Sequence, residues 1–141
     1  MEASNWVQMG LLIVAILTVI ASSYWSAKAI KETQKQAKRQ YEFQFFAEYT
    51  KRYQDIILHM PDDVNDPHWL RYVQLYFDLC SEEFYLHEEG LISNRVWQLW
   101  VEGMQDILKR ESFRNAWKGN FGQYYTDRNF ISFMHHNVIK V

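Results

Sequence analysis

The sequence predicts an all-α fold, in which an N-terminal transmembrane helix continues into a long helix that is followed by a small cytoplasmic helical bundle. Residues 6 to 25 contain no charged side chain. The chain has only five Gly and two Pro residues, and it lacks the alternating Val, Ile and Thr runs that are typical of strands. Beyond residue 40, apolar side chains recur every three or four positions, which is the spacing of one helix face. These observations favour helices throughout.

The apolar run WVQMGLLIVAILTVIASSYW, residues 6 to 25, is long enough to cross a bilayer. Twenty helical residues rise about 30 Å, which matches the hydrocarbon core of a membrane. Trp6 at one end, and Tyr24 and Trp25 at the other, are predicted as membrane-interface residues because their rings are apolar and carry one polar group. The alternative is a buried core helix, but a domain of this size rarely buries so long an uncharged run.

The residues on either side of this run predict its orientation. Residues 1 to 5 carry only Glu2, so they lack the positive charge of a cleavable signal peptide, although Ala21 and Ser23 form a small-x-small pair that a peptidase accepts. Residues 26 to 40 contain five basic residues against Glu32 and carry a net charge of +4. The positive-inside rule therefore predicts that residues 1 to 5 lie outside and that the C-terminal domain is cytoplasmic.

The basic segment predicts a contact with lipid. Its lysines follow a 3-4-3 spacing, which places them on one helix face: Lys28, Lys31, Lys35 and Lys38. A basic side chain near anionic headgroups contributes about 1 kcal/mol. The simpler interpretation is a topology signal on a solvated face.

Residues 41 to 141 are predicted to form one cytoplasmic helical domain, which is acidic: ten Lys or Arg stand against fifteen Asp or Glu. This charge and the absence of a basic aromatic patch argue against nucleic-acid binding. The single cysteine, Cys80, excludes an intrachain disulfide, and its apolar neighbours predict a buried core position.

Turn and cap signals divide this domain into helices. The first stripe runs from Tyr41 through Tyr49 to Met60, and the helix either continues unbroken from residue 6 or hinges near Gln40. Asp66 and Pro67 predict the start of a second helix, and Gly90 its end. Its expected inward side chains are Leu70, Val73, Phe77, Cys80 and Phe84, with Trp69, Tyr72, Tyr76 and Tyr85 widening the apolar surface.

Two further signals predict the rest of the bundle. Ser93 is a predicted N-cap for a helix over residues 94 to 110, with Lys109 and Arg110 at its negative end and Gly103 allowing a close approach. A short helix is expected over residues 112 to 118, closed by Gly119. Asp127 is expected to cap a last helix to about residue 137, with Phe130, Phe133 and Met134 inward.

Aromatic residues are unusually frequent, with 24 Phe, Trp or Tyr among 141 residues. Such side chains supply large buried area, and Tyr and Trp are also favoured at interaction surfaces. We expect most of them in the core, with part of the set Trp97, Trp100 and Trp117 forming a partner surface.

The acids and histidines do not form a recognisable catalytic or metal-binding pattern. Asp78 and Glu82 are four residues apart, as are Glu83 and His87, but a di-iron bundle needs a second Glu-x-x-His copy. His135 and His136 are adjacent and therefore point in different directions on a helix. No Ser/His/Asp group or glycine-rich phosphate loop is found. The prediction is a non-enzyme without a cofactor, metal or identified small-molecule substrate.

The pattern resembles short bacterial single-pass membrane proteins of unknown function. The segments that carry the likeness are FQFFAEYTKRYQDIILHMP, LRYVQLYFDLCSEEFYLHEEGLISNRVWQLWVEGM and FISFMHH. This resemblance implies placement in a bacterial inner membrane and supplies no site residues.

The sequence therefore favours a membrane-anchored, non-enzymatic interaction or regulatory module that contacts lipid and either binds a protein partner or self-associates. The alternative is an oligomerising membrane effector of a defence or toxin-type system that perturbs the bilayer. The small residues Gly10, Ala15, Ala21, Ser22 and Ser23 suit helix association, but the run contains no Gly-xxx-Gly pair and no charge.

Overall fold

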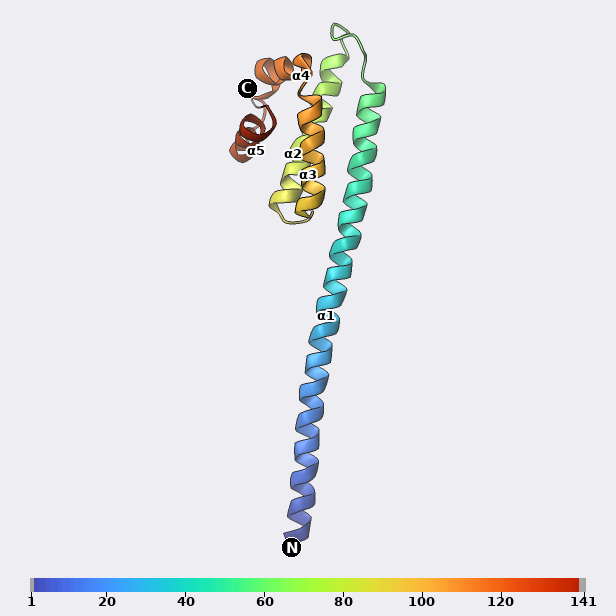
Figure 1. The fold of residues 1–141 in the computed structure, drawn as a ribbon, viewed down its shortest axis with the longest axis vertical. Helices are drawn as coiled ribbons and strands as arrows, with labels where there is room; N and C mark the ends of the chain where they lie inside the picture. Colours follow the sequence, from blue (N-terminus) through green and yellow to red (C-terminus); the bar gives the residue numbers. More distant parts are fainter. Residues whose placement is uncertain (1, 140–141) are drawn as a thin grey trace. The chain divides into compact units, whose positions relative to one another are not determined.

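A computed structural model describes residues 2 to 139, with side-chain burial given for residues 4 to 139 (Figure 1). The described residues are helical and contain no strand, which confirms the all-α prediction. The α-helices are α1 (Glu2–His59), α2 (Trp69–Glu88), α3 (Asn94–Ile107), α4 (Glu111–Ala116) and α5 (Arg128–Phe133). Two π-helical segments, η1 (Trp117–Phe121) and η2 (Met134–Val138), follow α4 and α5 directly.

The chain divides into two compact units, Met1–Gln40 and Tyr41–Val141. We call the second one the helical unit. It contains the C-terminal part of α1 together with all later elements. The first unit consists of a single helical stretch, and the core of the protein belongs to the helical unit.

The start of α2 differs slightly from the prediction. Asp66 accepts a hydrogen bond from the backbone N–H of His68 at 2.7 Å, so it does cap a turn. That turn is not yet α-helical, and α2 begins at Trp69 rather than at Pro67. The predicted start is therefore two residues early.

The connection between α2 and α3 confirms both predicted caps. Gly90 has φ of +66°, a left-handed conformation that glycine adopts without a Cβ penalty. The N–H of Leu91 donates to Leu86 O at 3.0 Å, which closes the end of α2. Ser93 Oγ accepts from the N–H of Val96 at 3.4 Å and caps α3.

The C-terminal end of α3 corrects the prediction for Lys109 and Arg110. The helix stops at Ile107, so neither residue belongs to its last turn. Arg114 from α4 supplies the cation instead, because its Nη1 donates to Leu108 O at 2.7 Å and to Lys109 O at 2.6 Å. The expected close approach at Gly103 is also wrong, since a Cβ placed there would meet nothing within 4 Å.

The two short C-terminal helices each loosen into a π-helical segment. The N–H of Gly122 donates to Trp117 O at 2.7 Å, five residues back, so Gly119 lies within η1 and does not close the preceding helix. In the last helix, Asp127 Oδ1 accepts from the N–H groups of Asn129 and Phe130, as predicted for a cap. The N–H of Ile139 then donates to Met134 O at 2.8 Å, closing η2.

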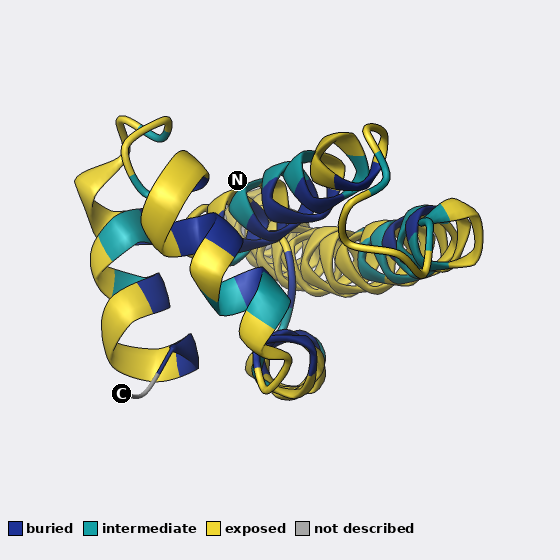
Figure 2. Cartoon of the chain, turned by 90° about the horizontal axis from the view of Figure 1, so that it is seen from above, coloured by how far each residue is buried: buried dark blue, intermediate teal, exposed yellow. Residues whose placement is uncertain are grey.

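Buried residues lie on one face of each helix in the helical unit (Figure 2). Aromatic side chains make up much of the core. Phe77 is fully buried, and its ring lies 5.0 Å from that of Trp117 and 5.7 Å from that of Phe121. The predicted inward residues Val73, Cys80 and Phe84 are buried, whereas Leu70 is 45% exposed because the first turn of α2 directs Trp69 inward instead. Tyr41 and Tyr85 are also exposed.

Candidate functional site

The apolar part of α1 is one candidate functional region. An 18-residue window within Ser4–His59 has a mean hydropathy of 2.0, and none of it is buried. α1 is thus long and apolar enough to cross a membrane. The predicted interface residues Trp6, Tyr24 and Trp25 are all exposed.

The predicted lipid-contacting lysines follow this segment on the same helix. Lys28, Lys31, Lys35 and Lys38 are exposed, and the helical backbone places them on one face. The ammonium of Lys28 lies 5.3 Å from the centroid of the Trp25 ring, a cation–π contact that connects the basic segment to the predicted interface ring.

The predicted partner surface at Trp97, Trp100 and Trp117 is corrected by the structure. Their side chains are only 7%, 9% and 0% exposed. Trp117 packs on Tyr125 at 5.7 Å, and Trp97 stacks on the imidazole of His87 at 4.6 Å. Because the helical unit closes over these rings, they belong to the core and its edge.

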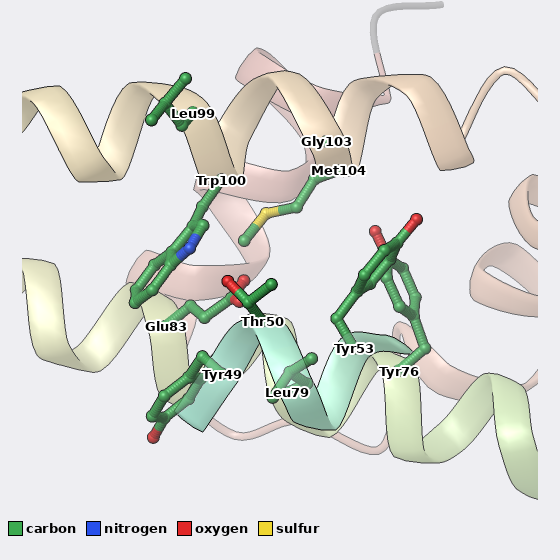
Figure 3. Close-up of a pocket in the computed structure, with 10 residues that line it drawn as sticks. All are labelled: Tyr49, Thr50, Tyr53, Tyr76, Leu79, Glu83, Leu99, Trp100, Gly103 and Met104. Atoms are coloured by element: carbon green, nitrogen blue, oxygen red, sulfur yellow. The ribbon is translucent and has the colours of Figure 1, made fainter. Parts of the chain in front are cut away.

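The helical unit contains a cavity of about 180 Å³ between α1, α2 and α3 (Figure 3). Aromatic rings border it in two pairs: Tyr49 with Trp100 on one side, and Tyr53 with Tyr76 on the other. The ring centroids are 5.5 Å apart in the first pair and 6.3 Å in the second. The remaining lining residues are Thr50, Leu79, Glu83, Leu99, Gly103 and Met104.

Glu83 is the polar residue that distinguishes this cavity. It is 6% exposed and is the single charged residue among the buried side chains of residues 4 to 139. Its carboxyl group lies between the two aromatic pairs (Figure 3). Burial raises the pKa of Glu83 from 4.5 to about 8, because the apolar surroundings disfavour its charged form.

The neighbouring ion pair explains why Glu83 has no cationic partner. Arg52 donates two hydrogen bonds to the carboxylate of Glu82, at 2.6 and 3.0 Å. Tyr49 Oη donates to the same carboxylate at 3.0 Å. These bonds hold the pKa of Glu82 below its usual value, with the Arg52 hydrogen bond as the largest cause. Within residues 4 to 139, no hydrogen bond or ion pair reaches the Glu83 side chain.

The other acids, the histidines and the cysteine thiol of the described residues make separate contacts and are not grouped at one site. Asp78 accepts a hydrogen bond from Tyr125 Oη at 2.7 Å, and His87 stacks on Trp97. His135 and His136 are exposed. Cys80 is buried as predicted, and burial raises the pKa of its thiol. Among the described residues, no group of three His, Cys, Asp or Glu side chains is placed to hold a metal ion.

Sequence spacing pairs Glu83 with His87 and does not predict its burial, although a signal for that burial exists. Glu83 follows Tyr76 by seven residues and Leu79 by four, so all three share one face of α2. A carboxylate in register with buried apolar residues indicates a buried acid. The neighbouring Glu82 obscures this signal because the pair reads as an exposed acidic segment.

Comparison of the chain with protein-family models, with curated proteins and with solved structures gives no match.

Proposed function

We propose that this chain is a single-pass inner-membrane protein, anchored by residues 6 to 25, whose helical unit acts in the cytoplasm as a non-enzymatic interaction or regulatory module. The observation that carries the proposal is the complete exposure of the apolar window in α1. Soluble proteins rarely leave so large a continuous apolar surface in water, whereas lipid covers it at no such cost.

The flanking residues support the proposed orientation. The +4 charge of residues 26 to 40 favours retention of that side in the cytoplasm. The exposed lysine face, Lys28 to Lys38, also suits anionic headgroups, so we assign lipid contact to it. The single, buried Cys80 is compatible with a reducing compartment.

A topology experiment tests the anchor and its direction. A protease-sensitive tag placed after residue 141 is expected to resist protease added to intact cells and to be cleaved after lysis. A matched tag before residue 1 is expected to be cleaved once the outer barrier is permeabilised. Cleavage of the C-terminal tag in intact cells would contradict the orientation.

Cross-linking in membranes tests the interaction role. We expect a discrete cross-linked species, either with a second copy of the chain or with a partner protein. The membrane-effector alternative predicts instead that overexpression collapses the membrane potential, which a potential-sensitive dye measures. A chain that stays monomeric and enriches no partner would count against the module.

A further inference from the structure

We propose that the cavity between α1, α2 and α3 binds a quaternary ammonium group, with Glu83 as its counter-charge and the rings of Trp100, Tyr53 and Tyr76 as its walls. This site goes beyond the proposed function and stands whether or not the chain is anchored in a membrane.

The cavity has the size of a small organic group. A cavity of about 150 Å³ in another protein core holds benzene, whereas a single water needs about 15 Å³. The cavity here measures about 180 Å³, so it accommodates a trimethylammonium group. Leu99 and Gly103 line it and are exposed, which gives the cavity an opening to the surface.

The aromatic walls suit a cation. The face of an aromatic ring is electron-rich and attracts a positive charge within about 6 Å. Tyr49 already demonstrates this in the same site, because the guanidinium carbon of Arg52 lies 5.0 Å from its ring centroid. Among the described residues, no cation lies over the rings of Trp100, Tyr53 and Tyr76, so they remain for a ligand.

The buried carboxyl group gives the cavity its charge preference. Arg52 and Glu82 neutralise each other through their two hydrogen bonds. Ionised Glu83 therefore leaves the site with one net negative charge, which a monovalent cation cancels. A buried carboxylate without a partner is costly, and a cation between the aromatic walls removes that cost.

The lining distinguishes a quaternary ammonium from a primary one. A primary ammonium carries three N–H donors, and inside the cavity each donor needs an acceptor from the lining or from water. Glu83 and Thr50 supply acceptors, but the rest of the non-aromatic lining is apolar: Leu79, Leu99, Gly103 and Met104. Methyl groups on nitrogen pack against such surfaces and require no hydrogen bond, so the trimethylated group fits better.

Choline is the probe of choice because two close analogues separate charge from shape. The full-length protein is purified in a maltoside detergent, which has no ammonium group, and is titrated calorimetrically at pH 8. We expect choline to bind with a dissociation constant on the order of 1 mM or tighter. Its uncharged isostere 3,3-dimethyl-1-butanol and the primary amine ethanolamine are each expected to bind at least about tenfold more weakly.

Three variants test the residues. Glu83→Gln keeps the side-chain shape but removes the counter-charge, and it is expected to weaken choline binding at least about tenfold. Glu102→Gln makes the same change at an exposed position of α3 and is expected to leave the affinity unchanged. Gly103→Leu is expected to obstruct the cavity while improving the local helix propensity, so its loss of binding does not reflect unfolding.

Nanodiscs identify the source of the ammonium group. If the natural ligand is a lipid headgroup, free choline binds in phosphatidylglycerol discs and is outcompeted in discs that contain phosphatidylcholine. Equal binding of choline in the two kinds of disc indicates that the natural ligand is a soluble compound. Either result supports the site. Equal affinity for choline and its neutral isostere, stronger binding of ethanolamine, unchanged binding by Glu83→Gln, or no choline binding would each overturn it.

Discussion

Residues 6 to 25 and the α1–α2–α3 cavity depart from ordinary burial in opposite ways. The first region leaves a run of apolar side chains uncovered, and the second encloses a carboxyl group among aromatic rings. Both arrangements are unfavourable for a chain alone in water. Each becomes favourable when a particular environment is supplied, which is lipid for the first and a cation for the second. Both proposed sites therefore lie where the folded chain by itself leaves an energetic cost.

Two arginines in the apolar run are expected to have the largest effect. Leu12→Arg with Ile16→Arg places two charges near the centre of the proposed span, at a cost of roughly 6 kcal/mol for insertion. The double variant should leave the membrane fraction, as measured by immunoblotting after ultracentrifugation. The matched control, Leu12→Ala with Ile16→Ala, should remain in the membrane. An arginine variant that stays in the membrane fraction would contradict the proposed membrane span.

The pH dependence of stability tests the second region. Glu83 has a pKa of about 8 in the folded chain and 4.5 as its ordinary value, so between these pH values the unfolded state releases a proton that the folded state keeps. Stability therefore falls as pH rises from about 4.5 to 8, by about 5 kcal/mol, and then levels off.

Glu83→Gln isolates this contribution from that of Glu82, which has the opposite sign because its folded pKa is lowered. The free energy of unfolding of each protein is measured by chemical denaturation in detergent at pH 5 and pH 8.5. Between pH 5 and pH 8.5, the free energy of unfolding of the wild type should fall by several kcal/mol relative to that of the variant. A constant difference between the two proteins would show that Glu83 titrates normally.

Trp117→Ala is expected to destabilise the helical unit by about 3 to 5 kcal/mol, because it leaves a large cavity beside Phe77. Trp117 is buried and does not line the cavity, whereas Trp100 borders it. Chemical denaturation should show the lower free energy of unfolding of the Trp117→Ala variant. Trp6→Ala, in the exposed segment, should leave the free energy of unfolding of the helical unit unchanged.

Ser93→Ala is expected to cost about 1 kcal/mol. It removes the cap of α3 and one bond to Glu42, whose carboxylate accepts from Ser93 Oγ at 2.9 Å and from its N–H at 2.8 Å. The charge of Glu42 also suits the positive end of α3. Ser93→Thr retains the hydroxyl and should recover most of the loss in the same denaturation assay. If the Ser93→Ala variant proves as stable as the Ser93→Thr variant, the hydroxyl cap does not stabilise α3.

Arg52→Met is expected to have the smallest effect, at most about 1 kcal/mol, because its ion pair with Glu82 is partly exposed and screened by water. The substitution retains the apolar stem of the side chain. It should make stability less dependent on salt, measured from 0.05 to 0.5 M NaCl, than in the wild type. An unchanged salt dependence would remove Arg52 from the electrostatics of this region.

Local signals in the sequence predicted much of the fold. The caps at Ser93 and Asp127 and the end at Gly90 depend on residues a few positions apart, and the structure has all three. The end of α3 could not be predicted in this way, because Arg114 from another helix supplies its capping donor. The π-helical segments were missed for the same reason, since buried Trp117 and Met134 are fixed by tertiary packing.

The candidate sites show a similar division. The apolar run is contiguous in sequence and is visible there without a structure. The cavity unites Tyr49, Glu83 and Trp100 from three helices, and no spacing along the chain reveals that they meet. For Trp97, Trp100 and Trp117, composition alone does not separate a core ring from a surface ring, which is why the predicted partner surface was wrong.

Extraction of membranes with alkaline carbonate tests the central claim most directly. This treatment releases proteins held by charge alone and retains those whose apolar segment lies in the bilayer. We predict that the full-length chain remains in the membrane pellet and floats with lipid in a density gradient. Recovery of the wild-type protein in the carbonate-soluble fraction would contradict the account.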